Sequence, residues 1–330
     1  MRLRPSPRNG VRLGERYRIE GLLASGGTSE VYVATDEQSG DRVMIKWLTP
    51  RAALDSQLRE RFVLSARVTM AVEHQSVLRV FGVQAPADTE PYLVMEALAG
   101  EALSDYLLRT PAMPEALVLR LARDVASALV AAHRVGIVHR DVKPGNLFLL
   151  GPLGEPTGVK VIDFGLAKDT QDPEAGPNST NLVLGTAQYM APEQVLADPV
   201  DPRTDVYAFG VLLFRTLTGQ LPFDLDPGAD LFSHQLFSPA PPPSWLLESV
   251  DPRLERLILR CMRKHPDNRY PSMQALLDDL ETIAGSATAA TADAPPLAPD
   301  PDVYQPRNQK GRDAAEALAA YFGTQPPPAG

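Results

Sequence analysis

Two hydrophobic periodicities divide the chain, and the first of them lies between Tyr17 and Glu96. There, short apolar runs alternate with polar positions and are separated by small or turn-forming residues, a pattern that predicts β-strands. One stretch in this part repeats its apolar residues every three or four positions and predicts a helix. The expected strands are 17–23, 31–34, 43–48, 77–83 and 91–96, and the expected helix is 55–73.

Helical spacing dominates the second part of the chain. A long helix is expected after Pro114, because Val118, Leu121, Val125 and Leu129 keep to one stripe. A later helix is apolar on nearly every side, which indicates a position inside a packed lobe. The other expected elements are a short helix at 103–108, the apolar helix at 205–214, a closing helix at 272–284 and a β-pair formed by 147–150 and 159–162.

The composition changes at both ends. Residues 1–16 are polar and basic with two prolines, so we expect a flexible lead-in. Residues 285–330 are rich in Ala, Thr, Pro and Asp, which is typical of a disordered linker, with a short helix expected around 313–322. The ordered chain between them is expected to form two lobes, 17–97 and 98–284.

Charge and cysteine content exclude several classes of protein. The 32 basic and 41 acidic residues give a net charge of −9, which argues against nucleic acid or an anionic membrane surface as the main partner. The single cysteine excludes an intramolecular disulfide and a multi-cysteine metal site. No apolar run reaches the roughly 18 residues of a membrane span, and the basic start lacks an apolar segment. We therefore expect a cytoplasmic protein.

The main concentration of chemical groups lies in His139-Arg140-Asp141-Val142-Lys143-Pro144-Gly145-Asn146, followed by Asp163-Phe164-Gly165. An aspartate here can accept a proton from an attacking hydroxyl, and Lys143 can neutralise charge on a transferred group. The oxygens of Asn146 and Asp163 suit Mg²⁺, which prefers few hard ligands and borrows phosphate oxygens. Such a set is typical of phosphoryl transfer, in which catalysis consists of positioning and charge stabilisation.

These two motifs resemble the catalytic loop and the magnesium-binding triplet of eukaryotic-type (Hanks-type) bacterial serine/threonine protein kinases. Lys143-Pro144 resembles the serine/threonine branch more than the tyrosine branch. The resemblance covers residues 17 to 284 and implies an α+β, two-lobed protein kinase fold with a small β-rich N-lobe and a larger helical C-lobe. It also implies ATP and Mg²⁺, with Asp141, Lys143 and Lys46 in catalysis and Asn146 and Asp163 as metal ligands.

The resemblance also assigns the nucleotide site. Lys46 stands where the family places the lysine that grips the α- and β-phosphates, and Glu96 to Leu98 stand at the purine-binding hinge. Gly26 keeps the middle glycine of the phosphate-binding turn, where backbone N–H groups can approach phosphates. The nucleotide-binding residues implied are Leu23, Gly26, Val31, Lys46, Glu96, Leu98 and Phe148.

Some positions depart from the family pattern. Ser65 stands where the family has a glutamate that pairs with the strand lysine, and a serine cannot neutralise Lys46. The lysine is expected to lean on phosphate or on Asp163 instead. Ala24 and Ser29 replace the two outer glycines of the turn, and Met44 replaces a small residue against the adenine. These departures keep open a second hypothesis, a pseudokinase that acts as a nucleotide-binding or scaffold module.

Residues 185–193 resemble the end of a kinase activation segment, which favours a peptide substrate over a small-molecule kinase of similar fold. The preceding polar loop contains two candidate phosphorylation sites, and Arg140 can bind a phosphate placed there. Thr186 is expected to reach Asp141 and Lys143. The resemblance gives structural roles to Asp205, Glu193 and Arg269: Asp205 holds the catalytic loop, and the other two form a buried ion pair. The candidate phosphorylation sites are Ser179 and Thr180.

The main hypothesis is thus a serine/threonine protein kinase that transfers the ATP γ-phosphoryl group to protein hydroxyls in signalling. A protein substrate is the expected partner, and a homodimer that phosphorylates itself is a further candidate assembly.

Overall fold

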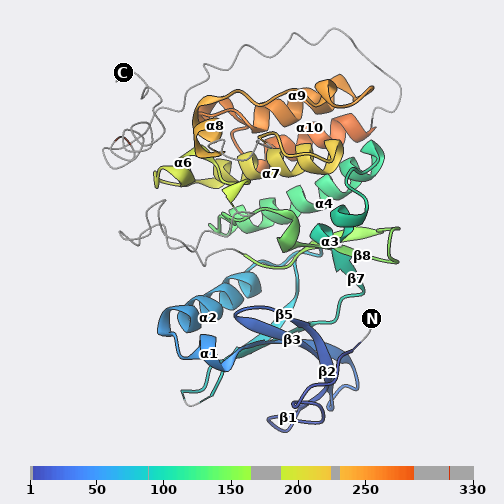
Figure 1. The fold of residues 1–330 in the computed structure, drawn as a ribbon, viewed down its shortest axis with the longest axis vertical. Coiled ribbons are helices and arrows are strands. Elements are labelled where there is room, and N and C mark those ends of the chain that lie inside the picture. Colours follow the sequence, from blue (N-terminus) through green and yellow to red (C-terminus); the bar gives the residue numbers. More distant parts are fainter. Residues whose placement is uncertain (1–2, 88, 165–186, 224–230, 286–311, 313–330) are drawn as a thin grey trace. The chain divides into compact units, whose positions relative to one another are not determined.

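The computed structural model describes residues 3–87, 89–164, 187–223, 231–285 and 312. The chain divides into two compact units. The first consists of Met1–Glu101 with Leu149–Ala167, and the second of Ala102–Phe148 with Lys168–Gly330. The first unit is mostly β-sheet and the second mostly helix (Figure 1), as the two periodicities of the sequence predict.

The first unit is built on a six-stranded antiparallel sheet. Alternation of apolar and polar residues gives each strand one buried face, and the buried side chains of that face include Ile19, Tyr32, Ile45 and Val94. The strand order is β1 (Arg12–Leu13), β2 (Tyr17–Ser25), β3 (Ser29–Asp36), β4 (Arg42–Leu48), β6 (Tyr92–Glu96) and β5 (Val80–Gln84).

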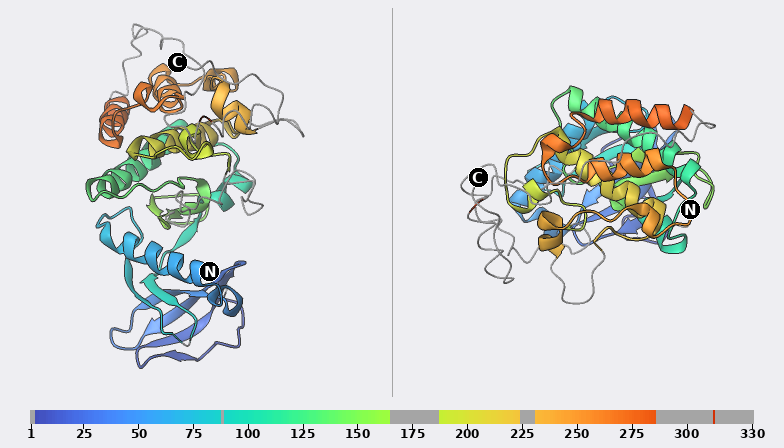
Figure 2. Two further views of the ribbon diagram at one scale, coloured as in Figure 1. Left: turned by 90° about the vertical axis from the view of Figure 1, so that its left-hand side faces the viewer. Right: turned by 90° about the horizontal axis from the view of Figure 1, so that it is seen from above.

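Helix α2 (Ser56–Ala71) packs against β5 in this unit (Figures 1 and 2), after a single turn, α1 (Pro50–Ala53). The Asp55 carboxylate begins α2 by accepting hydrogen bonds from two backbone N–H groups of its first turn. The buried positions of α2 are Phe62, Ala66 and Thr69, whereas Met70 is 42% exposed. The face of α2 that contains Phe62, Ala66 and Thr69 is therefore the buried one.

The described part of the expected lead-in, residues 3–16, has more structure than its composition indicates. Arg4 and Leu22 exchange backbone hydrogen bonds at 2.8 and 3.1 Å, and β1 adds a short edge strand. The Arg8 guanidinium lies over the Trp47 ring, 3.7 Å from its centroid. A cation over an aromatic face is stabilising, so tertiary contacts order a segment that has little hydrophobic content of its own.

The expected strand 77–83 begins later, at Val80. Val77 instead forms a parallel bridge with Val161, and the Leu78 N–H donates to the Val161 carbonyl at 2.8 Å. These bonds join the segment that leads to Asp163 to the segment that precedes β5, within the first unit. A second sheet has the order β7 (Gly100–Ala102), β8 (Leu147–Leu150) and β9 (Gly158–Val161).

Helix α7 (Pro202–Thr218) lies at the centre of the second unit, with nearly all of its side chains buried. It packs against α4 (Glu115–Arg134), α9 (Pro252–Cys261) and α10 (Met273–Gly285), and the views of Figures 1 and 2 agree on this arrangement. The Asp201 side chain caps the start of α7, and Gly219 ends it with φ of 78°, a left-handed conformation that favours glycine. Elsewhere in the described residues, the helical elements are α3 (Leu103–Arg109), η1 (Pro144–Asn146), α6 (Pro192–Val195), α8 (Leu231–Phe237), η2 (Pro243–Trp245) and η3 (Pro266–Asn268).

Among the described residues, no helix combines the length and apolar character needed to cross a membrane. The short helix expected around 313–322 lies outside the described residues.

Candidate active site

The backbone of the loop at residues 139–146 is anchored by a carboxylate of α7. Asp205 is fully buried and accepts hydrogen bonds from the N–H groups of His139 and Arg140, both at 2.8 Å. Arg140 has φ of 64°, a strained conformation for a residue with a side chain. The two bonds from Asp205 help to hold the loop in that conformation. This is the placement that the sequence predicts for Asp205.

His133, near the end of α4, completes this anchor. Its Nε2 lies 2.7 Å from an oxygen of Asp205. Gln194, from α6, donates a hydrogen bond to the Arg140 carbonyl at 2.8 Å. Sequence reasoning missed both residues, because a histidine in the long helix α4 and a glutamine in the single turn α6 have no distinctive spacing. Only packing shows that they support Arg140 and its neighbours.

The Asp141 carboxylate lies within a small polar cluster. The Lys143 Nζ donates to Asp141 Oδ2 at 2.7 Å, and the Asn146 Nδ2 donates to the same oxygen at 3.0 Å and to the Asp141 carbonyl at 2.7 Å. Both Asp141 and Lys143 remain partly exposed. The cluster therefore offers a carboxylate and an ammonium group side by side, while the amide nitrogen of Asn146 faces Asp141 and leaves its oxygen for another ligand.

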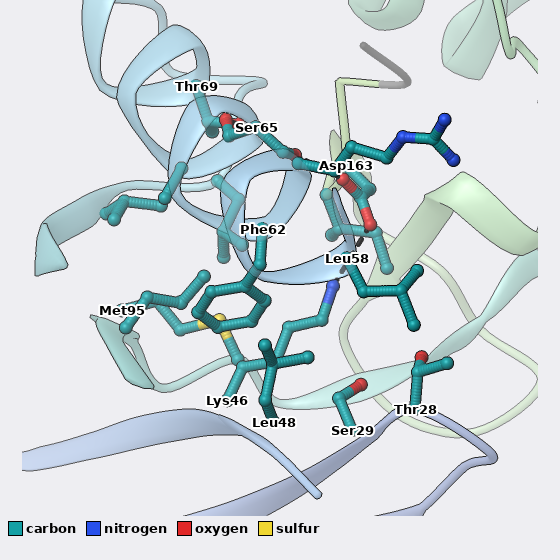
Figure 3. A pocket seen from close by; sticks show the side chains of 16 residues that line it. Thr28, Ser29, Lys46, Leu48, Leu58, Phe62, Ser65, Thr69, Met95 and Asp163 are labelled. Carbon is teal, nitrogen blue, oxygen red and sulfur yellow. Dashed lines mark hydrogen bonds and ion pairs between the residues drawn. The ribbon is translucent and has the colours of Figure 1, made fainter. Parts of the chain in front are cut away.

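A second polar cluster, in the first unit, joins Lys46, Ser65 and Asp163 (Figure 3). Lys46 Nζ donates to Asp163 Oδ2 at 3.0 Å. The Ser65 hydroxyl donates to Asp163 Oδ1 at 2.9 Å and also lies 3.2 Å from the Phe164 carbonyl. Of the two partners considered for Lys46, the structure shows Asp163. The sequence indicated only that Ser65 replaces the glutamate of the family. In the structure, the Ser65 hydroxyl is bonded to the same carboxylate as Lys46.

This cluster borders a cavity of about 190 Å³ within the first unit. The cavity lies between α2 and the sheet, with Lys46, Ser65 and Asp163 on its polar side (Figure 3). Phe62 and Met95 are among its apolar walls. Met44, the departure expected beside the adenine, is buried and pairs in register with Met95.

The other expected nucleotide-binding residues lie in different surroundings. The Glu96 side chain accepts a hydrogen bond from Lys160 and another from the Arg79 N–H, so it is engaged within its own unit. Gly26 donates its N–H to the Ser29 carbonyl at 2.9 Å and closes the turn between β2 and β3. Leu98 is buried, and the side chains that remain half-buried are Leu23, Val31 and Phe148.

Glu193 and Arg269 form a buried, bidentate ion pair, with both distances 2.8 Å. Arg269 also donates to the carbonyls of Arg203, Arg263 and Lys264. Burial alone would raise the pKa of Glu193, but Arg269 and the Thr204 hydroxyl together hold that pKa below its ordinary value. The sequence predicts the pair, but not the carbonyl groups that complete the coordination of the guanidinium.

Ser179, Thr180 and Thr186 lie outside the described residues. Arg140, which is expected to bind a phosphate on Ser179 or Thr180, is described, and its Nε is buried.

The sequence model of the family described as "Protein kinase domain" matches residues 17–280. The chain belongs to the protein kinase family. This kinase is 38% identical to the serine/threonine-protein kinase Pkn1 of Myxococcus xanthus over 322 residues, which are 93% of this chain and 46% of Pkn1. It is 36% identical to the serine/threonine-protein kinase PknL of Mycobacterium tuberculosis over 278 residues, 84% of this chain and 68% of PknL.

Among solved structures, the kinase is similar to the PknI kinase domain of Mycobacterium tuberculosis, with a TM-score of 0.63 and 25% identity over 84% of this chain and 99% of that one. These similarities confirm the protein kinase fold and the bacterial serine/threonine type expected from the motifs. The kinase spans less than half the length of Pkn1. Membership of the family implies the use of ATP and a divalent metal ion.

Proposed function

We propose that the protein is an active serine/threonine protein kinase, which transfers the γ-phosphoryl group of ATP to serine or threonine hydroxyls of proteins. The observation that carries the proposal is the Asp141 cluster: a carboxylate 2.7 Å from the Lys143 ammonium, on a loop whose backbone is anchored to buried Asp205. Phosphoryl transfer depends on such positioning and on charge stabilisation.

In this proposal Asp141 orients the substrate hydroxyl and accepts its proton. The hydroxyl oxygen forms a bond to the γ-phosphorus, while the bond from that phosphorus to the bridging oxygen breaks and ADP leaves. Lys143 lies beside Asp141 and can stabilise the negative charge on the transferring phosphoryl group. A general base must lie within hydrogen-bond reach of the proton that it accepts, and the partial exposure of Asp141 leaves it open to a substrate.

Asn146 and Asp163 are the proposed ligands of Mg²⁺. Their donor set fits a hard cation: Asp163 supplies carboxylate oxygens, and the Asn146 amide nitrogen is already bonded to Asp141, so its oxygen is the atom left for a metal. When bound, Mg²⁺ neutralises the phosphate oxygens and orients them. The described residues contain no group of three or more His, Cys, Asp or Glu side chains placed to hold a metal, and phosphate oxygens would complete the coordination.

The remaining assignments also belong to the proposal. Lys46 grips the nucleotide phosphates, and the backbone of Glu96 to Leu98 binds the purine, which agrees with the engagement of the Glu96 side chain elsewhere. The two lobes are residues 17–97 and 98–284. The other proposed nucleotide contacts are Leu23, Gly26, Val31 and Phe148.

Regulation by phosphorylation is the last part of the proposal. Ser179 and Thr180 are proposed acceptor sites, and Arg140 is the proposed phosphate-binding residue, because a guanidinium forms strong charge-assisted bonds to phosphate. Thr186 is proposed to help seat the substrate hydroxyl. Autophosphorylation between two copies of the chain would supply the phosphate.

A binding-only pseudokinase is less well supported. The residues proposed for transfer are all present, and Pkn1 and PknL bear the names of serine/threonine kinases. The deciding experiment is incorporation of labelled phosphate from Mg-ATP into the protein itself and into a generic basic protein, beside an Asp141→Asn variant. We expect incorporation that disappears in the variant. Nucleotide binding without incorporation would instead support the pseudokinase.

A further inference from the structure

Two hydroxyl side chains, one turn apart on the buried face of α2, have different partners. The Thr69 hydroxyl donates to the carbonyl of Ser65, four residues earlier, at 2.9 Å. This is the usual way in which a serine or threonine inside a helix satisfies its hydroxyl. The Ser65 hydroxyl instead reaches out of the helix to Asp163, which is 98 residues further along the chain. The two residues thus differ in role although they share a face.

Ser65 and Lys46 hold opposite oxygens of one carboxylate (Figure 3). Oδ1 of Asp163 accepts from Ser65 at 2.9 Å, and Oδ2 accepts from Lys46 at 3.0 Å. Because the two donors come from different elements, α2 and β4, the carboxylate cannot rotate without breaking one of the bonds. A hydroxyl has a single proton, and the shorter contact, to the charged Asp163 rather than to the Phe164 carbonyl, is also the stronger type of bond.

We infer that Ser65 is a positioning residue for Asp163, and that through Asp163 it sets the affinity of the kinase for its metal ion. This inference rests on the proposed function, in which Asp163 is a metal ligand. The family resemblance places a partner of Lys46 at position 65. In this protein the residue at that position, Ser65, bonds instead to the proposed metal ligand Asp163. A neutral hydroxyl fixes the direction of the carboxylate without adding a positive charge that would repel a cation.

The magnitude expected follows from other metal sites. Removal of a group that orients a metal ligand typically weakens metal affinity by about 10–100-fold. We therefore expect a loss of about tenfold or more in metal affinity when the hydroxyl at position 65 is removed. A change in overall stability alone would not weaken metal binding in the variants that lack this hydroxyl and spare it in the variant that keeps it.

The test compares Ser65→Thr with Ser65→Val in the full chain. Threonine and valine have nearly the same shape and both are branched at Cβ, so the pair differs in the hydroxyl alone. Binding of Mn²⁺ would be measured by electron paramagnetic resonance of the free ion, with a non-hydrolysable ATP analogue present. No turnover is required. We expect Ser65→Thr to bind Mn²⁺ as the unaltered protein does, and Ser65→Val and Ser65→Ala to bind it about tenfold more weakly or worse.

The control on the same helix is Thr69→Val, which removes a hydroxyl that is bonded within α2. We expect this variant to keep its Mn²⁺ affinity. Equal Mn²⁺ affinity for Ser65→Thr and Ser65→Val would overturn the inference, and so would an equal loss in Thr69→Val. Binding of the ATP analogue can also be measured in the absence of metal. If Ser65→Val alone weakened that binding, Ser65 would act through Lys46, and the inference would again be overturned.

The proposed function fails separately, in the transfer assay with Asp141→Asn. A kinase that transfers phosphate but shows no difference between the Thr and Val variants contradicts only the inference about Ser65. A protein that shows no transfer, yet separates the two variants in Mn²⁺ binding, contradicts the proposed activity and supports the role of Ser65.

Discussion

The buried carboxylate of Asp205 accepts a hydrogen bond from the backbone N–H of His139, 66 residues earlier, at 2.8 Å. Through this bond, and a second one from the N–H of Arg140, helix α7 fixes the loop that contains Asp141. The loop that Asp205 anchors therefore explains why a carboxylate is buried in α7.

Replacement of Asp205 by asparagine would test this anchor. An amide can accept through one atom only, so one of the two backbone N–H groups would face an NH₂ group. The loop would move, and a shift of about 1 Å in a catalytic group can cost about a hundredfold in rate. We expect Asp205→Asn to lower kcat by about that factor while the KM for ATP changes little, as measured by steady-state phosphorylation.

Asp201→Asn is the matched control for that variant, because it changes a carboxylate on the same helix that caps the first turn of α7. The Asp201→Asn replacement should lower the free energy of unfolding by at most about 1 kcal/mol and leave kcat unchanged. Equal kcat for the Asp205 variant and the unaltered protein would contradict the anchoring role.

Removal of one partner of the buried Glu193–Arg269 pair is expected to lower the free energy of unfolding substantially. Arg269→Met would leave the Glu193 carboxylate buried without its cation, which typically costs about 3–5 kcal/mol. Urea unfolding should show this loss. Arg203→Met serves as the comparison, since the Arg203 pairs with Asp201 and Asp267 are partly exposed and such pairs are worth about 1 kcal/mol or less. A similar loss in both variants would mean that burial of the pair does not matter.

The same pair predicts a dependence of stability on pH. The pKa of Glu193 is lowered in the folded protein, so its contribution is fully present above the unfolded-state value of about 4.3. It is lost as the pH falls through the folded-state pKa, because the unfolded chain then binds more protons. We expect the free energy of unfolding to decrease below about pH 4.5, and to decrease less steeply in Glu193→Gln. Identical slopes for the two proteins would argue against the role of this carboxylate.

Lys46 provides a test of the nucleotide site. Lys46→Met keeps much of the length of the side chain but removes the charge, and also removes the partner of Asp163 Oδ2. Loss of one donor aimed at developing charge typically lowers kcat by about 10²–10³-fold, and we expect a decrease of that size in labelled-phosphate transfer. Arg42→Met, near the other end of β4 and paired with Glu20 on the surface, should retain its activity. Transfer by Lys46→Met at the unaltered rate would exclude Lys46 from the phosphate site.

The class of fold and the positions of most elements follow from the amino-acid sequence alone. Alternation at period two and helical stripes are local consequences of which side chains must avoid water, so β4, α4 and α7 could be located from the chain alone. The short motifs around Asp141 and Asp163 could be recognised for a related reason: their chemistry requires particular residue types at fixed short spacings.

The groups that support those motifs from distant parts of the chain are visible only in the packed fold. The bonds from His133 to Asp205 and from Ser65 to Asp163 join residues 72 and 98 positions apart. A single hydrogen bond of that span leaves no periodic trace in the sequence, because it depends on how the elements pack. The order in residues 3–16 has the same origin, since Arg8 lies over Trp47 only after the sheet has formed.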